Sequence, residues 1–270
     1  MSKIKFLTFL AALTLCQSAF GQMKGWEVGG WLGGSNYFGD LNDNWRLRRI
    51  GLAAGAGARY NFNDRLALRF GGSYGNISAY DSDSRNIYHQ RRNLSFKSII
   101  VDASANFEFN FLPYVHGDRE FYYTPYMFVG PSFYHFNPKA KLGDEWYDLR
   151  EFGTEGQFKG EEYNTTQAAI GYGFGFKFDL NYRWSLDLFI SGRKLFTDYL
   201  DDVSAFYPDM DDLESQRGDL AVLLSDRSGE PKIGEAGRQR GNGKNNDAFA
   251  FVGLGINYYF GAIRCPGIVR

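Results

Sequence analysis

The feature that most constrains this chain is a regular alternation of apolar and polar side chains, which recurs in segments of roughly ten residues along the sequence. In segment 99–111 the odd-numbered positions hold isoleucine, valine, alanine and phenylalanine, whereas aspartate, serine, asparagine and glutamate occupy most even-numbered positions. Inward carboxylates and amides fit the polar interior of a transmembrane β-barrel, whereas a soluble β-sandwich turns its polar face to water. The alternation therefore predicts an all-β chain that closes into a transmembrane barrel.

The connections between these segments indicate how the barrel is threaded. Eight strands are predicted, at residues 25–34, 50–62, 65–74, 97–111, 122–136, 166–180, 182–193 and 247–260. Short, turn-like connections follow the second, fourth and sixth strands, whereas long ones follow the other strands, and the last long one spans residues 196–246. This alternation is typical of outer-membrane barrels. We therefore expect an eight-stranded antiparallel transmembrane β-barrel with long extracellular loops, short periplasmic turns and both termini in the periplasm.

The start of the chain has the pattern of a secretory signal. Lys3 and Lys5 precede an apolar stretch at 6–16, and small residues at 19 and 21 suit signal peptidase. We expect a signal peptide at 1–21, an outer-membrane barrel at 22–260 and a periplasmic tail at 261–270. No later stretch is as long as the roughly 18 apolar residues of a spanning helix.

Composition supports this division. Aromatic residues make up 18% of the chain and glycines number 33, which suits a barrel with aromatic girdles and a crowded lumen. A net charge of −1 argues against a nucleic-acid partner.

Eight strands enclose an interior that side chains just fill, so a diffusion pore is not expected. We interpret the inward charges as ion pairs across the lumen in preference to a selectivity filter, because buried charges must be paired. The inward candidates are Arg59, Arg65, Arg69, Asp102, Glu108, Lys177, Asp179, Arg183, Asp187 and Arg193. The outward aromatic residues expected at the membrane interfaces are Tyr60, Phe62, Tyr74, Tyr172, Trp184 and Tyr258.

Few residues suggest chemistry. A lipid hydrolase would need a histidine beside a serine, and only His135 with Ser132, or His89 with Ser82 or Ser84, could supply one. Ordinary loop and turn histidines, including His116, are favoured, and no cofactor motif is present.

The last long connection opens with an acidic run. Its members are Asp198, Asp201, Asp202, Asp209, Asp211, Asp212 and Glu214. A solvated loop is favoured over a calcium site, because the spacing and the glycine turn of a calcium loop are missing. A short helix is expected at 213–224 and a flexible segment at 234–246.

Three stretches resemble a known family, the PorG-type outer-membrane barrels of Bacteroidota, which are components of the type IX secretion system. They are the first strand and loop at 25–41, the stretch 193–204, and the end of the chain from Tyr258 to Cys265 and Pro266. The residues that carry the loop signature are Asn36, Tyr37, Phe38, Gly39, Asp40, Leu41, Asp198, Tyr199, Asp201 and Asp202.

The resemblance implies a non-enzymatic role, and no cofactor or metal is expected because no binding motif for one is present in the sequence. A barrel of this family would sit in outer-membrane lipid and hold a periplasmic ring, made of a lipoprotein and its partner protein, against the membrane. The alternative functions are a surface adhesion or recognition barrel that uses the long last loop, and an outer-membrane lipid hydrolase.

Cys265 is the only cysteine left once the signal is removed, and its tail would lie in the oxidising periplasm. Its thiol could be free, capped by a small thiol or bonded to another protein. Given the resemblance, we expect an intermolecular disulfide with a periplasmic partner.

Overall fold

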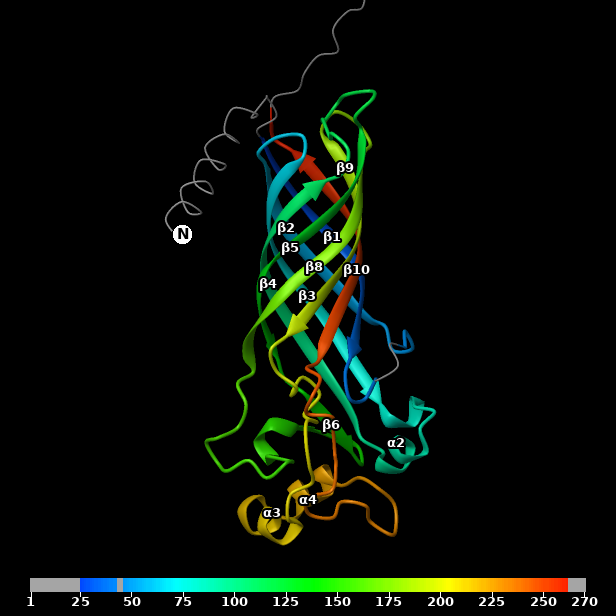
Figure 1. The fold of residues 1–270 in the computed structure, drawn as a ribbon, viewed down its shortest axis with the longest axis vertical. Helices are drawn as coiled ribbons and strands as arrows, with labels where there is room; N and C mark the ends of the chain where they lie inside the picture. The colour runs from blue at the N-terminus through cyan, green and yellow to red at the C-terminus, as the bar shows by residue number, and fades with distance from the viewer. Residues whose placement is uncertain (1–24, 43–45, 262–270) are drawn as a thin grey trace, which may run out of the picture.

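The computed structural model describes residues 25–42 and 46–261, and its main body is a closed barrel (Figure 1). The predicted signal peptide and Cys265 lie outside the described residues. The barrel strands are β1 (Gly25–Phe38), β2 (Gly51–Asn61), β3 (Leu66–Tyr80), β4 (Ser95–Asn110), β5 (Tyr123–Phe136), β8 (Thr166–Asp179), β9 (Trp184–Leu195) and β10 (Ala248–Tyr259).

Each barrel strand pairs antiparallel with the next barrel strand along the chain, and β1 closes the ring by pairing with β10. Closure leaves no barrel strand with an unpaired edge. The predicted fold class, an eight-stranded antiparallel transmembrane β-barrel, is confirmed. Strands β1 and β3 run at least four residues further than predicted: β1 continues to Phe38 and β3 to Tyr80, where Tyr80 still pairs with Ser95 of β4.

The two faces of the strands differ in chemistry, as the alternation predicts. In β4, Val101 is 50% exposed on the outer wall whereas its neighbour Asp102 is 1% exposed inside the barrel. Aromatic rings gather on the outer wall near the short turns, where Trp26 packs 5.1 Å from Tyr60 and Trp184 lies 5.0 Å from Tyr258 between ring centroids. An apolar outer wall with aromatic residues at its border is the surface that a bilayer requires.

No helix in the described ranges is both long and apolar enough to cross a membrane.

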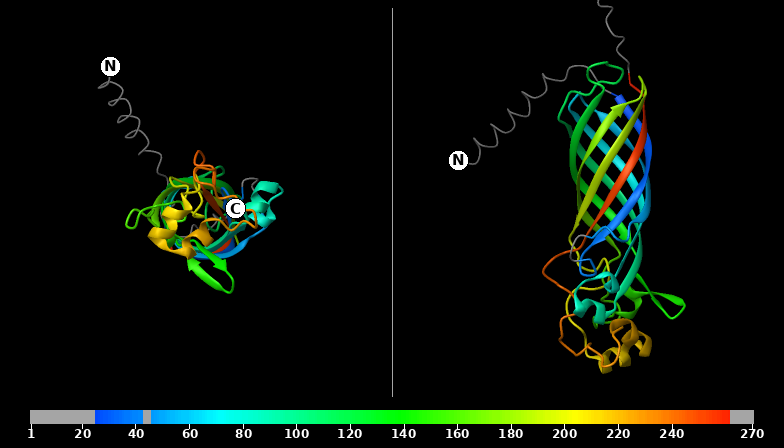
Figure 2. Two further views of the ribbon diagram at one scale, coloured as in Figure 1. Left: turned by 90° about the horizontal axis from the view of Figure 1, so that it is seen from below. Right: turned by 90° about the vertical axis from the view of Figure 1, so that its right-hand side faces the viewer.

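The long connections fold over one end of the barrel, which we call the long-loop end, and form a cap made of residues 81–94, 137–165 and 196–247 (Figures 1 and 2). The other end is the short-turn end. The regular elements of the cap are η2 (Asp81–Asp83), α2 (Ile87–Arg92), the hairpin of β6 (Lys139–Leu142) and β7 (Glu145–Asp148), η3 (Leu149–Phe152), α3 (Met210–Arg217) and α4 (Asp219–Ser225).

The single helix expected at 213–224 is two short helices, α3 and α4. Asp209 begins α3 by accepting hydrogen bonds from the amides of Asp211 and Asp212, and Gly218 separates α3 from α4 with a φ of 83°. That backbone conformation favours glycine, so the break is encoded locally.

The outer wall can be tested at Ala103, which faces outward in β4 between Gly72 of β3 and Phe133 of β5. We expect Ala103→Arg to lower the free energy of unfolding by about 2–4 kcal/mol in lipid vesicles, because the guanidinium would enter hydrocarbon. Ala103→Leu is the matched control and should be nearly neutral. Urea titration of both variants gives the measurement, and equal losses for arginine and leucine would contradict the assigned outer face.

Candidate functional site

The centre of the lumen is organised around one arginine. Arg59 of β2 reaches Glu27 of β1 at 2.8 Å, Glu108 of β4 at 2.7 Å and Asp187 of β9 at 2.7 Å. All four side chains are buried. Three carboxylates from three strands thus share one guanidinium, whose planar fork of N–H donors can serve them together.

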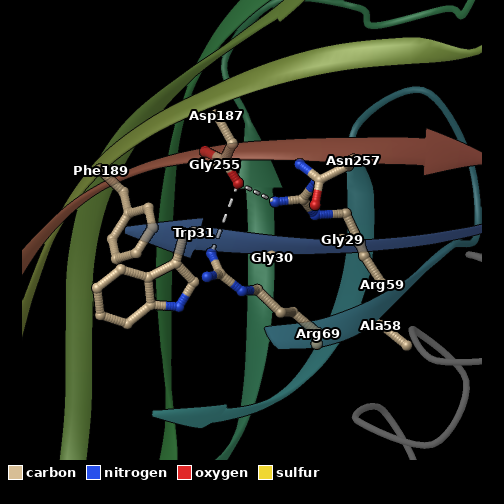
Figure 3. Close-up of a pocket in the computed structure, with 11 residues that line it drawn as sticks. Gly29, Gly30, Trp31, Ala58, Arg59, Arg69, Asp187, Phe189, Gly255 and Asn257 are labelled. Carbon is tan, nitrogen blue, oxygen red and sulfur yellow. Dashed lines mark hydrogen bonds and ion pairs between the residues drawn. The ribbon is translucent and has the colours of Figure 1, made fainter. Parts of the chain in front are cut away.

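Further cations complete the balance of charge. Lys177 lies 2.7 Å from Glu108, and Arg193 lies 2.7 Å from Asp102 near the long-loop end. Arg69 approaches both Glu108 and Asp187 at 3.7 Å. Figure 3 shows Asp187 between Arg59 and Arg69. The predicted pairing across the lumen is confirmed.

Two of the residues predicted to face the lumen lie outside it, so the prediction is wrong for them. Arg65 and Arg183 precede β3 and β9, lie exposed in the short turns and donate to the carbonyl oxygens of Phe111 and Tyr259. Both strands begin one or two residues later than predicted, which leaves these arginines outside the barrel.

The space between the lumen side chains is small. One cavity of about 20 Å³ is lined by Trp31, Arg59, Arg69 and Asp187 (Figure 3), and another of about 20 Å³ lies between Arg69 and Arg193. A volume of this size holds roughly one water molecule. Neither cavity offers a path for a solute.

His116 has a structural position that the sequence analysis missed. It lies in the connection from β4 to β5 at the short-turn end, where Nε2 is 3.1 Å from Glu27 and Nδ1 is 2.9 Å from Asp179. Its ring stacks on Tyr259 at 4.2 Å. Burial lowers the pKa of His116, but the two carboxylates outweigh it and raise the pKa to about 9. The imidazolium therefore covers the short-turn end of the lumen at neutral pH.

The two loop signatures meet at the long-loop end of the lumen. Tyr37, near the end of β1, donates its hydroxyl hydrogen toward Asp201 and Asp247, at 2.5 Å and 3.0 Å. The second oxygen of Asp247 accepts from the amide of Leu200 at 2.9 Å. We call Tyr37, Asp40, Asp198, Asp201, Asp202 and Asp247 the mouth cluster.

Gly39 is required where it stands in this cluster. A Cβ atom on Gly39 would lie 1.8 Å from Oδ1 of Asp247 and 2.1 Å from the hydroxyl oxygen of Tyr37. Any other residue would push the tyrosine and the aspartate apart, so the glycine of the signature has a packing reason.

The expectation of a solvated acidic run is wrong for its first three members. Asp198, Asp201 and Asp202 are buried, whereas Asp209, Asp211, Asp212 and Glu214 are exposed as expected. Asp202 accepts from Thr154 at 2.5 Å and from Tyr163 at 2.8 Å. For Asp202, hydroxyl donors from another connection thus replace water, which the local sequence does not reveal.

Segment 234–246, expected to be flexible, is anchored by one buried side chain. Arg240 contacts Glu155 at 3.0 Å and donates to the carbonyl oxygen of Asp202 at 2.6 Å. Arg92 of α2 donates to the carbonyl oxygen of Arg240 and forms an ion pair of 2.7 Å with Asp81. Two arginines therefore tie the three parts of the cap together.

Burial changes the acidity of the mouth cluster. It raises the pKa of Asp40 and of Asp202 to about 6, and burial together with the nearby Asp40 carboxylate raises the pKa of Asp198 to about 8. Burial also raises the pKa of Asp201 and of Asp247 well above the ordinary value. In the part of the chain that the structure describes, no group of three or more His, Cys, Asp or Glu side chains is arranged to hold a metal ion.

The structure separates one of the two candidate histidine and serine pairs. Ser132 points into the lumen and bonds to Asp102, whereas His135 is exposed on the outer wall and lies 2.9 Å from Thr166. His89 does lie 3.4 Å from Ser84. Ser84, however, is buried, and its oxygen accepts from the amide of Asn86 at the start of α2.

We expect Arg59→Met to destabilise the barrel by about 3–5 kcal/mol, because it leaves buried carboxylates without their shared partner. Adding Glu27→Gln should recover part of the loss. The exposed Arg65 offers a matched control, and Arg65→Met should change stability little. Unfolding in urea measures all three, and an Arg59→Met barrel as stable as the control would rule out the central role of Arg59.

The mouth cluster predicts that the cap loosens as pH rises. Aspartates whose pKa is raised on folding stabilise the fold below their ordinary pKa near 3.8, and this stability is lost as pH rises through about 6 for Asp40 and Asp202 and about 8 for Asp198. Hydrogen exchange of the amides of 196–204, corrected for intrinsic rates, should therefore show less protection at pH 9 than at pH 5. Asp198→Asn should remove the part of this loss of protection that occurs near pH 8, whereas Asp211→Asn on the exposed helix α3 should leave it unchanged. Protection independent of pH would count against buried, protonated carboxyls.

The chain was compared with solved structures, curated protein sequences and protein-family models. Solved structures similar to this chain include Ail, the attachment invasion locus protein of Yersinia pestis (11% identity, TM-score 0.43, covering 88% of this chain and 100% of that one), Neisserial surface protein A (13%, 0.42, 87% and 97%) and OprG of Pseudomonas aeruginosa (8%, 0.45, 89% and 98%). No curated protein sequence matches. A family model, the domain of unknown function DUF6089, matches residues 4–221. The chain belongs to the DUF6089 family.

Proposed function

We propose that this barrel is a non-enzymatic docking component of the bacterial outer membrane, and that it anchors the periplasmic lipoprotein ring of a type IX secretion machine. The observation that carries the docking role is the filled lumen. Arg59 and its three carboxylates occupy the centre, and the cavity beside them measures about 20 Å³. A barrel without room for a solute acts through its outer surfaces.

The positions of the signature residues refine this proposal. Apart from Asp40, which is half-buried, the mouth cluster is buried under the cap and holds the connections together, so it supports the fold and offers little surface to a partner. A periplasmic partner would meet the short-turn end instead. The largest connection there, 111–122, exposes Leu112, Phe121 and Tyr122. Strand β10 ends at Tyr259, which stacks on His116 of this connection, and a disulfide from Cys265 to the ring belongs to the same proposal.

Deletion of the gene tests the secretion role directly. Export of type IX cargo should fall in the deletion strain and return with the wild-type gene. A Phe121→Asp barrel should restore export poorly, whereas an Arg65→Met barrel should restore it fully. Undiminished export without the gene would refute the role in secretion and leave the barrel fold untouched.

A second candidate, surface recognition by the cap, rests on exposed apolar side chains. Ile87, Phe158 and Leu223 are 79%, 61% and 47% exposed. Excision of residues 208–237 separates the two functions, because Phe206 and Gln239 pair as neighbours and a short turn can join the ends. Lost surface binding with intact export would favour recognition by the cap, and unchanged surface binding would count against it.

A further inference from the structure

A lateral pocket of about 320 Å³ opens on the outer wall at the long-loop end. Tyr172 of β8 and Lys194 of β9 line it from the wall, and Asp40 with the asparagines at 242, 245 and 246 lines it from the loops. Its volume is within the range of small-ligand sites, roughly 300–1,000 Å³. It is separate from the lumen cavities, which are lined by inward-facing residues.

Small residues on the wall create this hollow. Ala248 of β10 pairs with Lys194, and Gly192 of β9 pairs with Tyr172. A Cβ atom on Gly192 would lie 2.8 Å from the ring of Tyr172, so the ring lies across the glycine on the outer face. The residues that precede β10 overhang the space that Ala248 leaves open, since Lys194 donates to the carbonyl oxygen of Asn246 at 3.2 Å.

The polar groups of the pocket suit hydroxyl ligands. Among the described residues, the side-chain amides of Asn242 and Asn245 make no hydrogen bond, so each has donors and an acceptor available. A hydroxyl group also donates and accepts, and the exposed ring of Tyr172 offers an apolar face to the C–H groups of a sugar. The pocket is lined by one positive charge, the ammonium group of Lys194, and one negative charge, the carboxylate of Asp40. Because the two charges cancel, the pocket favours a mainly neutral polar ligand over a free anion.

The height of the pocket indicates where such a ligand comes from. Lys194 faces outward one residue before the long-loop end of β9, and Tyr172, in the middle of β8, faces outward at the level of Gly192, three residues before that end. Tyrosine and lysine at that level mark the interface between hydrocarbon and headgroups. We propose that the pocket binds carbohydrate, presented as the sugar headgroup of a membrane glycolipid. This inference does not depend on the role in secretion.

Binding is tested with the full-length barrel in a detergent without a sugar headgroup, using a neutral glycosyl diacylglycerol as the glycolipid probe and its released headgroup sugar as the soluble probe. Native mass spectrometry should detect the glycolipid on the wild-type barrel. Asn242→Leu with Asn245→Leu, and separately Tyr172→Ala, should weaken binding at least tenfold. Heat-dependent gel mobility checks that each variant folds.

The opposite wall provides the matched control. Tyr74 of β3 is exposed to a similar degree, 46% against 43% for Tyr172, and also faces outward. Tyr74→Ala should leave binding unchanged. Binding that is weakened by the pocket substitutions supports the carbohydrate site, whether the glycolipid binds alone or both probes bind. Binding of the soluble probe shows whether the lipid part is needed. Absence of binding, or equal loss in Tyr74→Ala and Tyr172→Ala, would overturn the proposal.

Discussion

The rest of the structure depends on the sharing of Arg59 by Glu27, Glu108 and Asp187. A barrel wall that meets hydrocarbon must place its polar residues on the inner face, and eight strands leave that face too narrow for bulk water. Charges held in such a space are stable only when they are paired and hydrogen-bonded. The ion pairs are therefore a consequence of the outer wall, and they leave the lumen without space for transport.

The same chemistry continues beyond the membrane into the cap. Tyr37 is the inward-facing residue near the end of β1, and its bonds to Asp201 and Asp247 extend the polar interior into the last connection. Arg240 and Arg92 extend it further, to Glu155 and Asp81. The cap is thus a folded continuation of the lumen, and its stability is coupled to the protonation of buried aspartates.

The sequence predicted the strands because alternation has a period of two and is read locally. It also predicted that charges in the lumen form ion pairs, but it did not predict the partners. Arg59 and Asp187, for example, are 128 residues apart, and they meet only because the strands pair in a fixed register around the closed barrel. For Asp202 local composition indicated solvent, whereas its hydroxyl partners Thr154 and Tyr163 come from another connection. The residues of the two loop signatures lie together at the long-loop end of the lumen. The family resemblance had identified them, whereas the alternation of side chains had not.

The lateral pocket follows from the way a capped barrel must be threaded. The last connection runs inside the cap at Arg240, which is buried, and must reach β10, where Ala248 faces the outer wall and Asp247 faces the mouth cluster. Residues 242–246 therefore cross from the interior of the cap to the rim of the barrel. The chain leaves a hollow beneath this crossing because Gly192 and Ala248 are small, and beside it lie the side-chain amides of Asn242 and Asn245, which make no hydrogen bond within the described residues. With the lumen filled and the mouth sealed, this rim is where the fold leaves polar groups open to the outer wall.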